Sequence, residues 1–258
     1  MQRLTNKQYQ DYLEHVVIPL FKRIIDKDFY SSIINHKFKM EICTTKSASS
    51  IGCSSWEEIR GLSYKNLERS TLAKKIFKDA YTAASREDIH IYAQKILTLQ
   101  KRALQEQTII SYIDLLPYNG IYKSFQTIYV PLFHPSGVVV ALQSYSLEFR
   151  FFNYQEYFHN FPIIQSHAQL NLEAEFSERE MAILFLLCNG ASQEQIGQIL
   201  NISRSLVASI ISNQLCGKFN IAGSNTKILT QAAINAGIHR QMPPLLWKPC
   251  IITLGPDT

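Results

Sequence analysis

Apolar residues recur with two different periods along this chain, and the change of period divides it into regions. In residues 5–26 and again in residues 86–107 they recur at helical spacing, which predicts two amphipathic helices. Pro19 lies inside the first of these segments and should kink the helix or begin its second part. The longest apolar runs are only a handful of residues, far short of a membrane span.

Other segments have the composition of β-strands, and they lie at residues 29–34, 39–45, 108–116, 120–133 and 137–149. Turn-forming residues at 35–37, 117–120 and 134–137 separate neighbouring runs. We therefore predict two strands, then helices that include a short one at 54–59, and then a three-stranded antiparallel meander.

The C-terminal part carries a third pattern, in which helix caps recur at short intervals. The residues predicted to cap helix N-termini are Ser177, Ser192 and Ser203, and Glu180 stands at the capping-box spacing from the first. Asn189-Gly190 should end the first helix, and Gly237 should end a last helix at 226–236. These signals predict a compact four-helix domain in which a tight turn at Asn201 separates two helices, as in a helix-turn-helix.

This segment resembles the LuxR-type helix-turn-helix family of bacterial transcription regulators. The matching elements are Phe176-Ser177-x-Arg179-Glu180, Leu186-Leu187, Gly190-x-Ser192, Ile196, Leu200-x-Ile202-Ser203, Val207, Asn213, Ala233 and Gly237-Ile238. The resemblance implies a DNA-binding domain at residues 176–240 that places its third helix in the major groove. The residues that it assigns to DNA contact are Ser192, Ser203, Arg204, Ser205, Ala208, Ser209, Ser212, Lys218 and Lys227.

The chain departs from the family pattern in the helices that should approach DNA. Glu194 and Gln195 stand where the family usually has Lys and an acidic residue, and the third helix carries one extra residue after Asn213. Basic residues in this domain exceed acidic ones only slightly, although Lys and Arg supply most of the affinity for phosphates. A monomer should therefore bind DNA weakly, and we expect a homodimer that reads two half-sites of double-stranded DNA.

The order of elements in residues 28–152 resembles the PAS sensor fold, which has five antiparallel strands with helices inserted after the second strand. The stretch from Ile51 to Leu62, with its small helix, resembles the corresponding PAS segment. Such a fold implies a pocket between sheet and helices, and the candidate ligand-binding residues are Trp56, Tyr112, Tyr129, Gln143 and Tyr145. The acyl-homoserine-lactone domain of other LuxR-type proteins is the alternative, but its tryptophan–tyrosine–aspartate pattern is not apparent around Trp56.

The whole sequence is therefore predicted to be α+β, with a PAS-like antiparallel sheet and its helices followed by an all-α four-helix domain. The expected parts are an N-terminal helix at 1–27, the PAS-like domain at 28–152, an apolar linker at 153–175, the helix-turn-helix domain at 176–240 and a docked tail at 241–258. The tail is expected to be non-helical because of its prolines.

Composition narrows the function further. The net charge of +5 suits a nucleic-acid partner, and the five cysteines include no CxxC pair, as expected of a cytoplasmic protein with reduced thiols. We expect no metal site and no cofactor, because clustered ligands and cofactor signatures are absent from the sequence. We also expect neither a signal peptide nor a membrane partner.

The sequence fits three classes of function to different degrees. A transcription regulator that responds to a small molecule or a partner protein fits the sequence best, with the sensor controlling dimerisation or DNA-site geometry. A protein-interaction module that retained the helical fold but lost DNA affinity is the alternative. An enzyme ranks last, because the sequence has no nucleophile elbow, P-loop or Gly-rich dinucleotide turn.

Overall fold

The computed structural model describes residues 4–118, 121–148, 175–240 and 242–254. The chain forms two compact units, one made by residues 1–149 together with 249–258 and the other by residues 150–248. Most of the predicted linker at 153–175 lies outside the described residues. No helix in the described ranges is long and apolar enough to cross a membrane.

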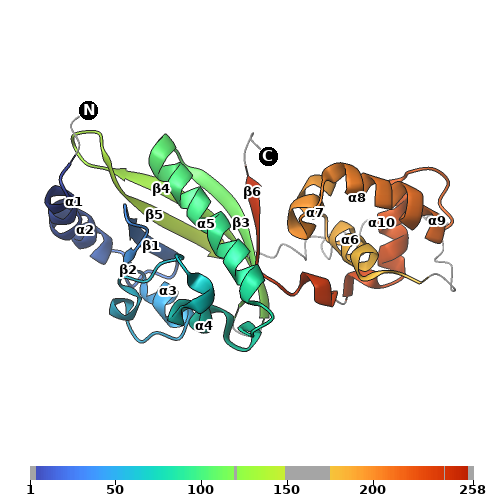
Figure 1. Ribbon diagram of the computed structural model, residues 1–258, viewed down its shortest axis with the longest axis horizontal. Coiled ribbons are helices and arrows are strands. Elements are labelled where there is room, and N and C mark those ends of the chain that lie inside the picture. The colour runs from blue at the N-terminus through green and yellow to red at the C-terminus, as the bar shows by residue number, and fades with distance from the viewer. Residues whose placement is uncertain (1–3, 119–120, 149–174, 241, 255–258) are drawn as a thin grey trace. The chain divides into compact units, whose positions relative to one another are not determined.

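The first unit is built on a six-stranded antiparallel sheet (Figure 1). Its strands are β1 (Tyr30–Asn35), β2 (Met40–Cys43), β3 (Ile110–Tyr118), β4 (Ile121–Phe133), β5 (Val139–Glu148) and β6 (Cys250–Leu254). They lie in the order β2-β1-β5-β4-β3-β6. The predicted hairpin and meander are confirmed, except that β3 continues through Pro117 and Tyr118, which were expected to be turn residues.

Helices lie on both faces of this sheet. The N-terminal helix runs without a break through α1 (Asn6–Tyr12), a π-helical turn (Leu13–Val17) and α2 (Ile18–Lys22), and Pro19 follows the π turn. Proline inside a helix removes a backbone donor, and the change from π to α hydrogen bonding coincides with its position. Its apolar side, including Leu13 and Phe21, packs on Ile33 of β1 and Val140 of β5. This helix therefore covers one face of the sheet over strands β1 and β5, and we call this the outer face.

The opposite face carries the larger core. It is covered by α3 (Thr45–Ser50), α4 (Thr71–Phe77) and the long helix α5 (Arg86–Glu106), with short 3-10 turns between them (Figure 1). Helix α5 buries the apolar stripe that its sequence period predicted. Helix α3 was not predicted; Thr44 caps it by accepting a hydrogen bond from the Ser47 backbone amide. Helices inserted after the second strand and packed on one face give this unit its PAS-like architecture.

The C-terminal tail supplies the sixth strand. Residues Cys250–Leu254 pair antiparallel with β3, for example Ile252 with Ile113, and Ile252 is only 1% exposed. Sequence analysis expected the tail to dock but predicted neither this strand nor the 3-10 turn at Pro244–Leu246 that precedes it. The two ends of the described chain thus both belong to the sheet unit.

The second unit is a bundle of four helical segments. They are α6 (Glu178–Cys188), α7 (Gln193–Leu200), a continuous run made of α8 (Arg204–Ile210), a π-helical turn (Ile211–Leu215) and α9 (Cys216–Lys218), and finally α10 (Thr226–Asn235). Ser177, Ser192 and Ser203 are the N-caps that the sequence predicted, and the first two complete capping boxes with Glu180 and Gln195. Because these interactions are local, the helix boundaries follow the sequence closely.

The turn between α7 and α8 is tight. Asn201 ends α7 in the left-handed conformation, and the backbone amide of Ile202 donates to the carbonyl oxygen of Gly197 at 2.9 Å. A Cβ atom at Gly197 would lie 2.7 Å from the carbonyl oxygen of Ile202, which is backbone and cannot move aside cheaply. Gly197 is therefore required for the close approach of the two helices.

This contact leads to a prediction about stability. Gly197→Ala should destabilise the helical unit by about 1–3 kcal/mol, the usual cost of overpacking, despite the better helix propensity of alanine. Gly217→Ala is the matched control, because a Cβ there meets nothing within 4 Å. Thermal unfolding followed by circular dichroism checks both variants. Equal melting temperatures for Gly197→Ala and wild type would contradict the assignment.

Candidate ligand cavity and nucleic-acid interface

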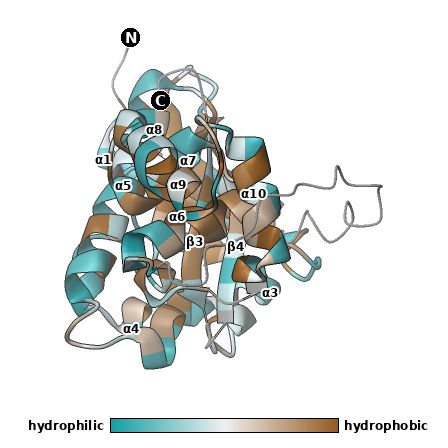
Figure 2. Ribbon diagram, turned by 90° about the vertical axis from the view of Figure 1, so that its right-hand side faces the viewer, coloured by the Kyte–Doolittle hydropathy of each residue, from teal (hydrophilic) through white to brown (hydrophobic). Residues whose placement is uncertain are grey.

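The helical run that begins at Arg204 presents a polar face to solvent. Val207 and Ile210 are buried in the bundle, whereas Arg204, Ser205 and Ser209 are exposed, together with the apolar Leu206. Hydrophilic and hydrophobic residues alternate along the helices of this unit (Figure 2). The predicted contacts Ala208 and Ser212 are partly exposed on the same helical run. Helix α8 thus has the amphipathic form that a recognition helix needs, with Arg204 in its first turn.

The remaining predicted DNA contacts differ in their surroundings. Ser192 and Ser203 use their hydroxyl oxygens to cap α7 and α8, each accepting from a backbone amide three residues later. Lys227 is exposed in the first turn of α10. Lys218 instead lies at the end of α9 with its Nζ 2.7 Å from Glu180 Oε1 and 2.8 Å from Glu180 Oε2.

The Lys218–Glu180 pair joins the end of the helical run from α8 to α9 to the start of α6. Burial of the Glu180 carboxyl opposes ionisation, but hydrogen bonds from Lys218 and Ser177 outweigh it and lower the pKa of Glu180. Lys218 Nζ also lies 5.0 Å from the ring centre of Phe176. Since Lys218 is engaged in these contacts, its charge is largely neutralised within the unit.

The extra residue that the sequence places after Asn213 has a structural counterpart. The helical run contains a π-helical turn at Ile211–Leu215, in which the amide of Cys216 donates to the carbonyl of Ile211. A π turn holds one residue more than an α turn, so it absorbs a single insertion without breaking the helix. Leu215 at the end of this turn and Phe219 after it are fully buried.

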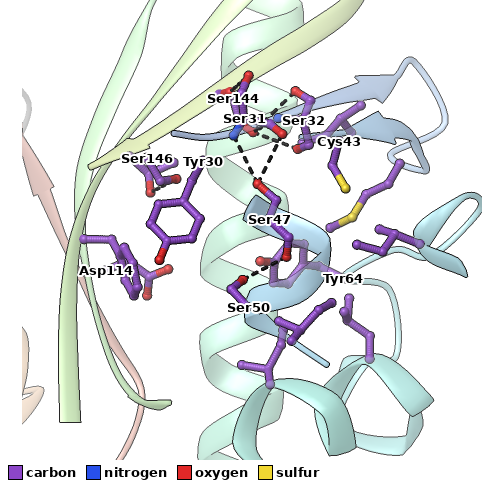
Figure 3. Close-up of a pocket in the computed structure, with 18 of the residues that line it drawn as sticks. Tyr30, Ser31, Ser32, Cys43, Ser47, Ser50, Tyr64, Asp114, Ser144 and Ser146 are labelled. Atoms are coloured by element: carbon purple, nitrogen blue, oxygen red, sulfur yellow. Dashed lines mark hydrogen bonds between the residues drawn. The ribbon is translucent and has the colours of Figure 1, made fainter. Parts of the chain in front are cut away.

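The sheet unit contains a cavity of about 160 Å³ between helices α3, α4 and α5 and the face of the sheet that they cover. Serine side chains on β1, α3 and β5 line it (Figure 3), and aromatic side chains on β3 and β4 complete the lining. Its polar and aromatic lining residues are Tyr30, Ser31, Ser32, Ser47, Ser50, Tyr64, Tyr92, Tyr112, Asp114, Tyr118, Phe125, Thr127, Tyr129, Ser144 and Ser146. An engineered cavity of about 150 Å³ holds benzene, so this one suits a molecule of about one ring.

Buried hydroxyl groups form a network at the β3 side of the cavity. The Tyr92 hydroxyl donates to Asp114 Oδ2 at 3.0 Å, and the Tyr112 and Tyr129 hydroxyl oxygens lie 2.9 Å apart. Gln100 Nε2 donates to the Tyr129 hydroxyl at 3.2 Å. Burial raises the pKa of Asp114 to about 7, and the hydrogen bond from Tyr92 offsets that rise only in part.

Two of the five predicted ligand residues, Tyr112 and Tyr129, line this cavity. Gln143 and Tyr145 lie on the other face of β5, because the strand directs Leu142, Ser144 and Ser146 inward. Trp56 packs beside the core at the outer helix, with Lys22 Nζ 5.5 Å from its ring centre, and does not line the cavity. The fold therefore does not place Trp56, Gln143 and Tyr145 in the cavity with Tyr112 and Tyr129.

Sequence analysis did not identify Asp114, although its position offered a signal. Asp114 lies two positions after Tyr112 in β3, so both side chains point to the same face of the sheet. It is the one acidic residue in a strand that is otherwise apolar or neutral. In the part of the chain that the structure describes, no group of three or more His, Cys, Asp or Glu side chains is placed to hold a metal ion.

Comparison with known proteins supports both halves of this description. Residues 174–228 match the family described as bacterial regulatory proteins, luxR family. The helical unit is accordingly a LuxR-type helix-turn-helix domain, joined here to a PAS-like sheet unit in an α+β chain. None of the curated proteins compared with the chain matches it.

Solved structures of VqmA share the fold of the whole chain. The Vibrio cholerae VqmA dimer, determined in the absence of target DNA, is 16% identical, covers 99% of this chain and 99% of its own, and has a TM-score of 0.50. A phage VqmA in complex with DPO is 17% identical, covers 95% of this chain and 99% of its own, and also has a TM-score of 0.50. At these identities the similarity is one of fold.

The raised pKa of Asp114 predicts how stability depends on pH. The folded state keeps the Asp114 proton up to a pH of about 7, whereas an unfolded aspartate loses it near pH 4. Because the folded state binds more protons between these values, the contribution of Asp114 to the free energy of unfolding falls as the pH rises through this window and is then constant. Tyr64, Tyr92, Tyr112 and Tyr129 around it have pKa values raised by burial, so they stay neutral there.

Urea unfolding of wild type and Asp114→Asn at pH 4.5, 6 and 8 tests this prediction. The advantage of wild type over the variant should shrink steadily with rising pH. A constant difference between the two proteins at all three values would show that Asp114 has an ordinary pKa.

Proposed function

We propose that this protein is a cytoplasmic, homodimeric transcription regulator that binds double-stranded DNA through α8 and binds a small molecule in the cavity of its PAS-like unit. The observation that carries the proposal is the outward-facing helix at Arg204, held by the tight turn at Gly197 inside a segment that matches the luxR family. The fold of VqmA, solved as a dimer by itself and with DPO in the phage protein, supports the wider assignment.

Dimerisation follows from the weakness of one DNA-binding unit. Arg204 is the one basic side chain in the first two turns of α8, and Lys218 is paired with Glu180. A single copy therefore neutralises few phosphates, and affinity falls with each contact that is missing. Two copies on adjacent half-sites double the number of contacts and add the geometric requirement of half-site spacing.

The path by which a ligand could control that geometry runs through β3 and β6. Strand β3 carries Tyr112 and Asp114 toward the cavity, and it pairs with β6 along its edge. Only residues 247–249 separate β6 from the 3-10 turn at Pro244–Leu246, which packs on α6 of the helical unit. A shift of the β3 backbone would therefore be passed along a short covalent connection to the DNA-binding domain.

A second candidate function is an interaction module that retains the helical fold without tight DNA binding. It is favoured by Glu194 and Gln195 in the first turn of α7 and by the engagement of Lys218 in the ion pair. The two functions make opposite predictions for the role of Arg204, since only the regulator needs its charge.

DNA binding provides the direct test of the regulator. Arg204→Ala should weaken binding to genomic fragments roughly tenfold, about 1.4 kcal/mol, as the loss of one charged contact implies. If Arg204 contacts a phosphate, the slope of log affinity against log salt should also decrease by about 1. Fluorescence anisotropy at low salt measures both quantities.

Arg86→Ala, an exposed arginine of the sheet unit, is the control for loss of net charge and should leave affinity nearly unchanged. Absence of DNA binding by the wild-type chain at low salt, with no change in Arg204→Ala, would favour the interaction module. Equal and measurable affinities for the two proteins would show that DNA binding does not depend on Arg204.

The connection through β6 is tested separately. Ile252→Asp places a charge at a buried position of β6 and should detach the strand, whereas Leu254→Asp introduces the same charge at its exposed end. Detachment should lower DNA affinity by about fivefold, because two recognition helices that are free to reorient lose the benefit of preorganisation. Hydrogen exchange of the β3 amides verifies detachment. If exchange increases but DNA affinity does not change, β6 does not transmit the signal.

A further inference from the structure

The cavity in the sheet unit has a marked charge asymmetry. Among its lining residues Asp114 is the one acidic side chain, and none is Lys, Arg or His. Burial raises the pKa of Cys43 to about 12, and burial likewise raises the pKa values of the lining tyrosines Tyr92 and Tyr112, so these groups are neutral near pH 7. Lys46 contacts Tyr30 and pairs with Asp28, but it is not part of the lining.

Asp114 is also incompletely satisfied. Its side chain is 8% exposed, and Oδ2 accepts the hydrogen bond from Tyr92. Oδ1 is buried and has no hydrogen-bond partner among the described residues. A buried carboxyl oxygen without a donor is unfavourable, so a ligand that supplies a donor to this carboxyl group would stabilise the folded protein.

The rest of the lining fits a cation better than an anion. Five tyrosines line the same cavity as Asp114, namely Tyr30, Tyr64, Tyr92, Tyr112 and Tyr129. Figure 3 shows the ring of Tyr30 beside Asp114. Aromatic faces attract a positive charge, and the attraction is stronger when the site is desolvated. An anionic ligand would meet the Asp114 carboxylate with no cationic side chain in the lining to offset the repulsion.

We propose that the cavity selects a molecule of about one ring that carries a basic nitrogen, whose protonated N–H group donates to the Asp114 carboxylate. This inference rests on the proposed sensor function and specifies the chemistry of its ligand. The positive nitrogen stabilises the ionised form of the carboxyl, which burial alone disfavours. The Ser146 and Thr127 hydroxyls also line the cavity, where they pair with each other at 2.8 Å. A hydroxyl oxygen has two lone pairs, so this pair still has acceptor capacity for another polar group of the ligand.

The test uses three probes of the same ring and different charge, namely benzylamine, benzyl alcohol and benzoate, with the full-length chain at pH 8. Isothermal titration should show that benzylamine binds at least tenfold more tightly than benzyl alcohol and that benzoate does not bind. Asp114→Asn keeps the shape of the side chain but removes its charge, and it should reduce benzylamine affinity to that of the alcohol.

Tyr92→Phe is the matched control. It removes the hydroxyl that donates to Asp114 Oδ2 but leaves the carboxylate in place. The preference for benzylamine should therefore persist in this variant, or increase. Circular dichroism melting confirms that each variant is folded, and if Asp114→Asn does not fold, the charge series on wild type and Tyr92→Phe still decides the question.

The outcomes separate the inference from the function on which it rests. Equal or tighter binding of benzyl alcohol, or unchanged benzylamine affinity in Asp114→Asn, would overturn the basic-nitrogen assignment while leaving a ligand cavity in place. If none of the three probes binds to wild type, both the assignment and the proposed small-molecule sensor fail, whereas the DNA-binding proposal is judged by Arg204 alone.

Discussion

The pairing of β3 with its two neighbours is the constraint on which the sheet unit depends. An antiparallel strand must direct alternate side chains to opposite faces and use its backbone groups for the strands beside it. In β3 this places Tyr112 and Asp114 in the cavity, while the same backbone holds β4 on one side and β6 on the other. The same strand, β3, therefore supplies side chains to the cavity and holds the C-terminal strand β6 through its backbone.

The helical unit is held by two contacts of a different kind. Close packing at Gly197 brings α7 against the start of α8, and the ion pair between Lys218 and Glu180 joins the end of the helical run from α8 to α9 to the start of α6. Between these points, the π-helical turn at Ile211–Leu215 keeps the buried side of the run continuous. The recognition helix is thus supported at both ends, which leaves the exposed face at Arg204 available to a partner. Under the proposed function, the few basic groups of that face are the reason for a second copy on DNA.

Much of the fold could be predicted from the sequence because its signals are local. The serine caps act on amides three residues away, and the turn at Asn201 needs only a residue that tolerates the left-handed conformation. The residues of the candidate site were harder to predict from the sequence. Period-two alternation shows that neighbouring residues of β5 face opposite sides, but it does not show which set faces inward, so Gln143 and Tyr145 were assigned to the cavity instead of Ser144 and Ser146.

By itself, the sequence determined the two kinds of architecture, the helix boundaries of the DNA-binding domain and the identity of α8 as its exposed helix. Each of these depends on residues that lie within a few positions of one another. The tertiary structure alone decided that the tail becomes β6, that Asp114 is buried with one oxygen unpaired, and that Lys218 is used within the unit. These features depend on contacts between distant segments, such as β3 with residues 250–254, and burial changes the charge preference of a side chain in a way that no local pattern reveals.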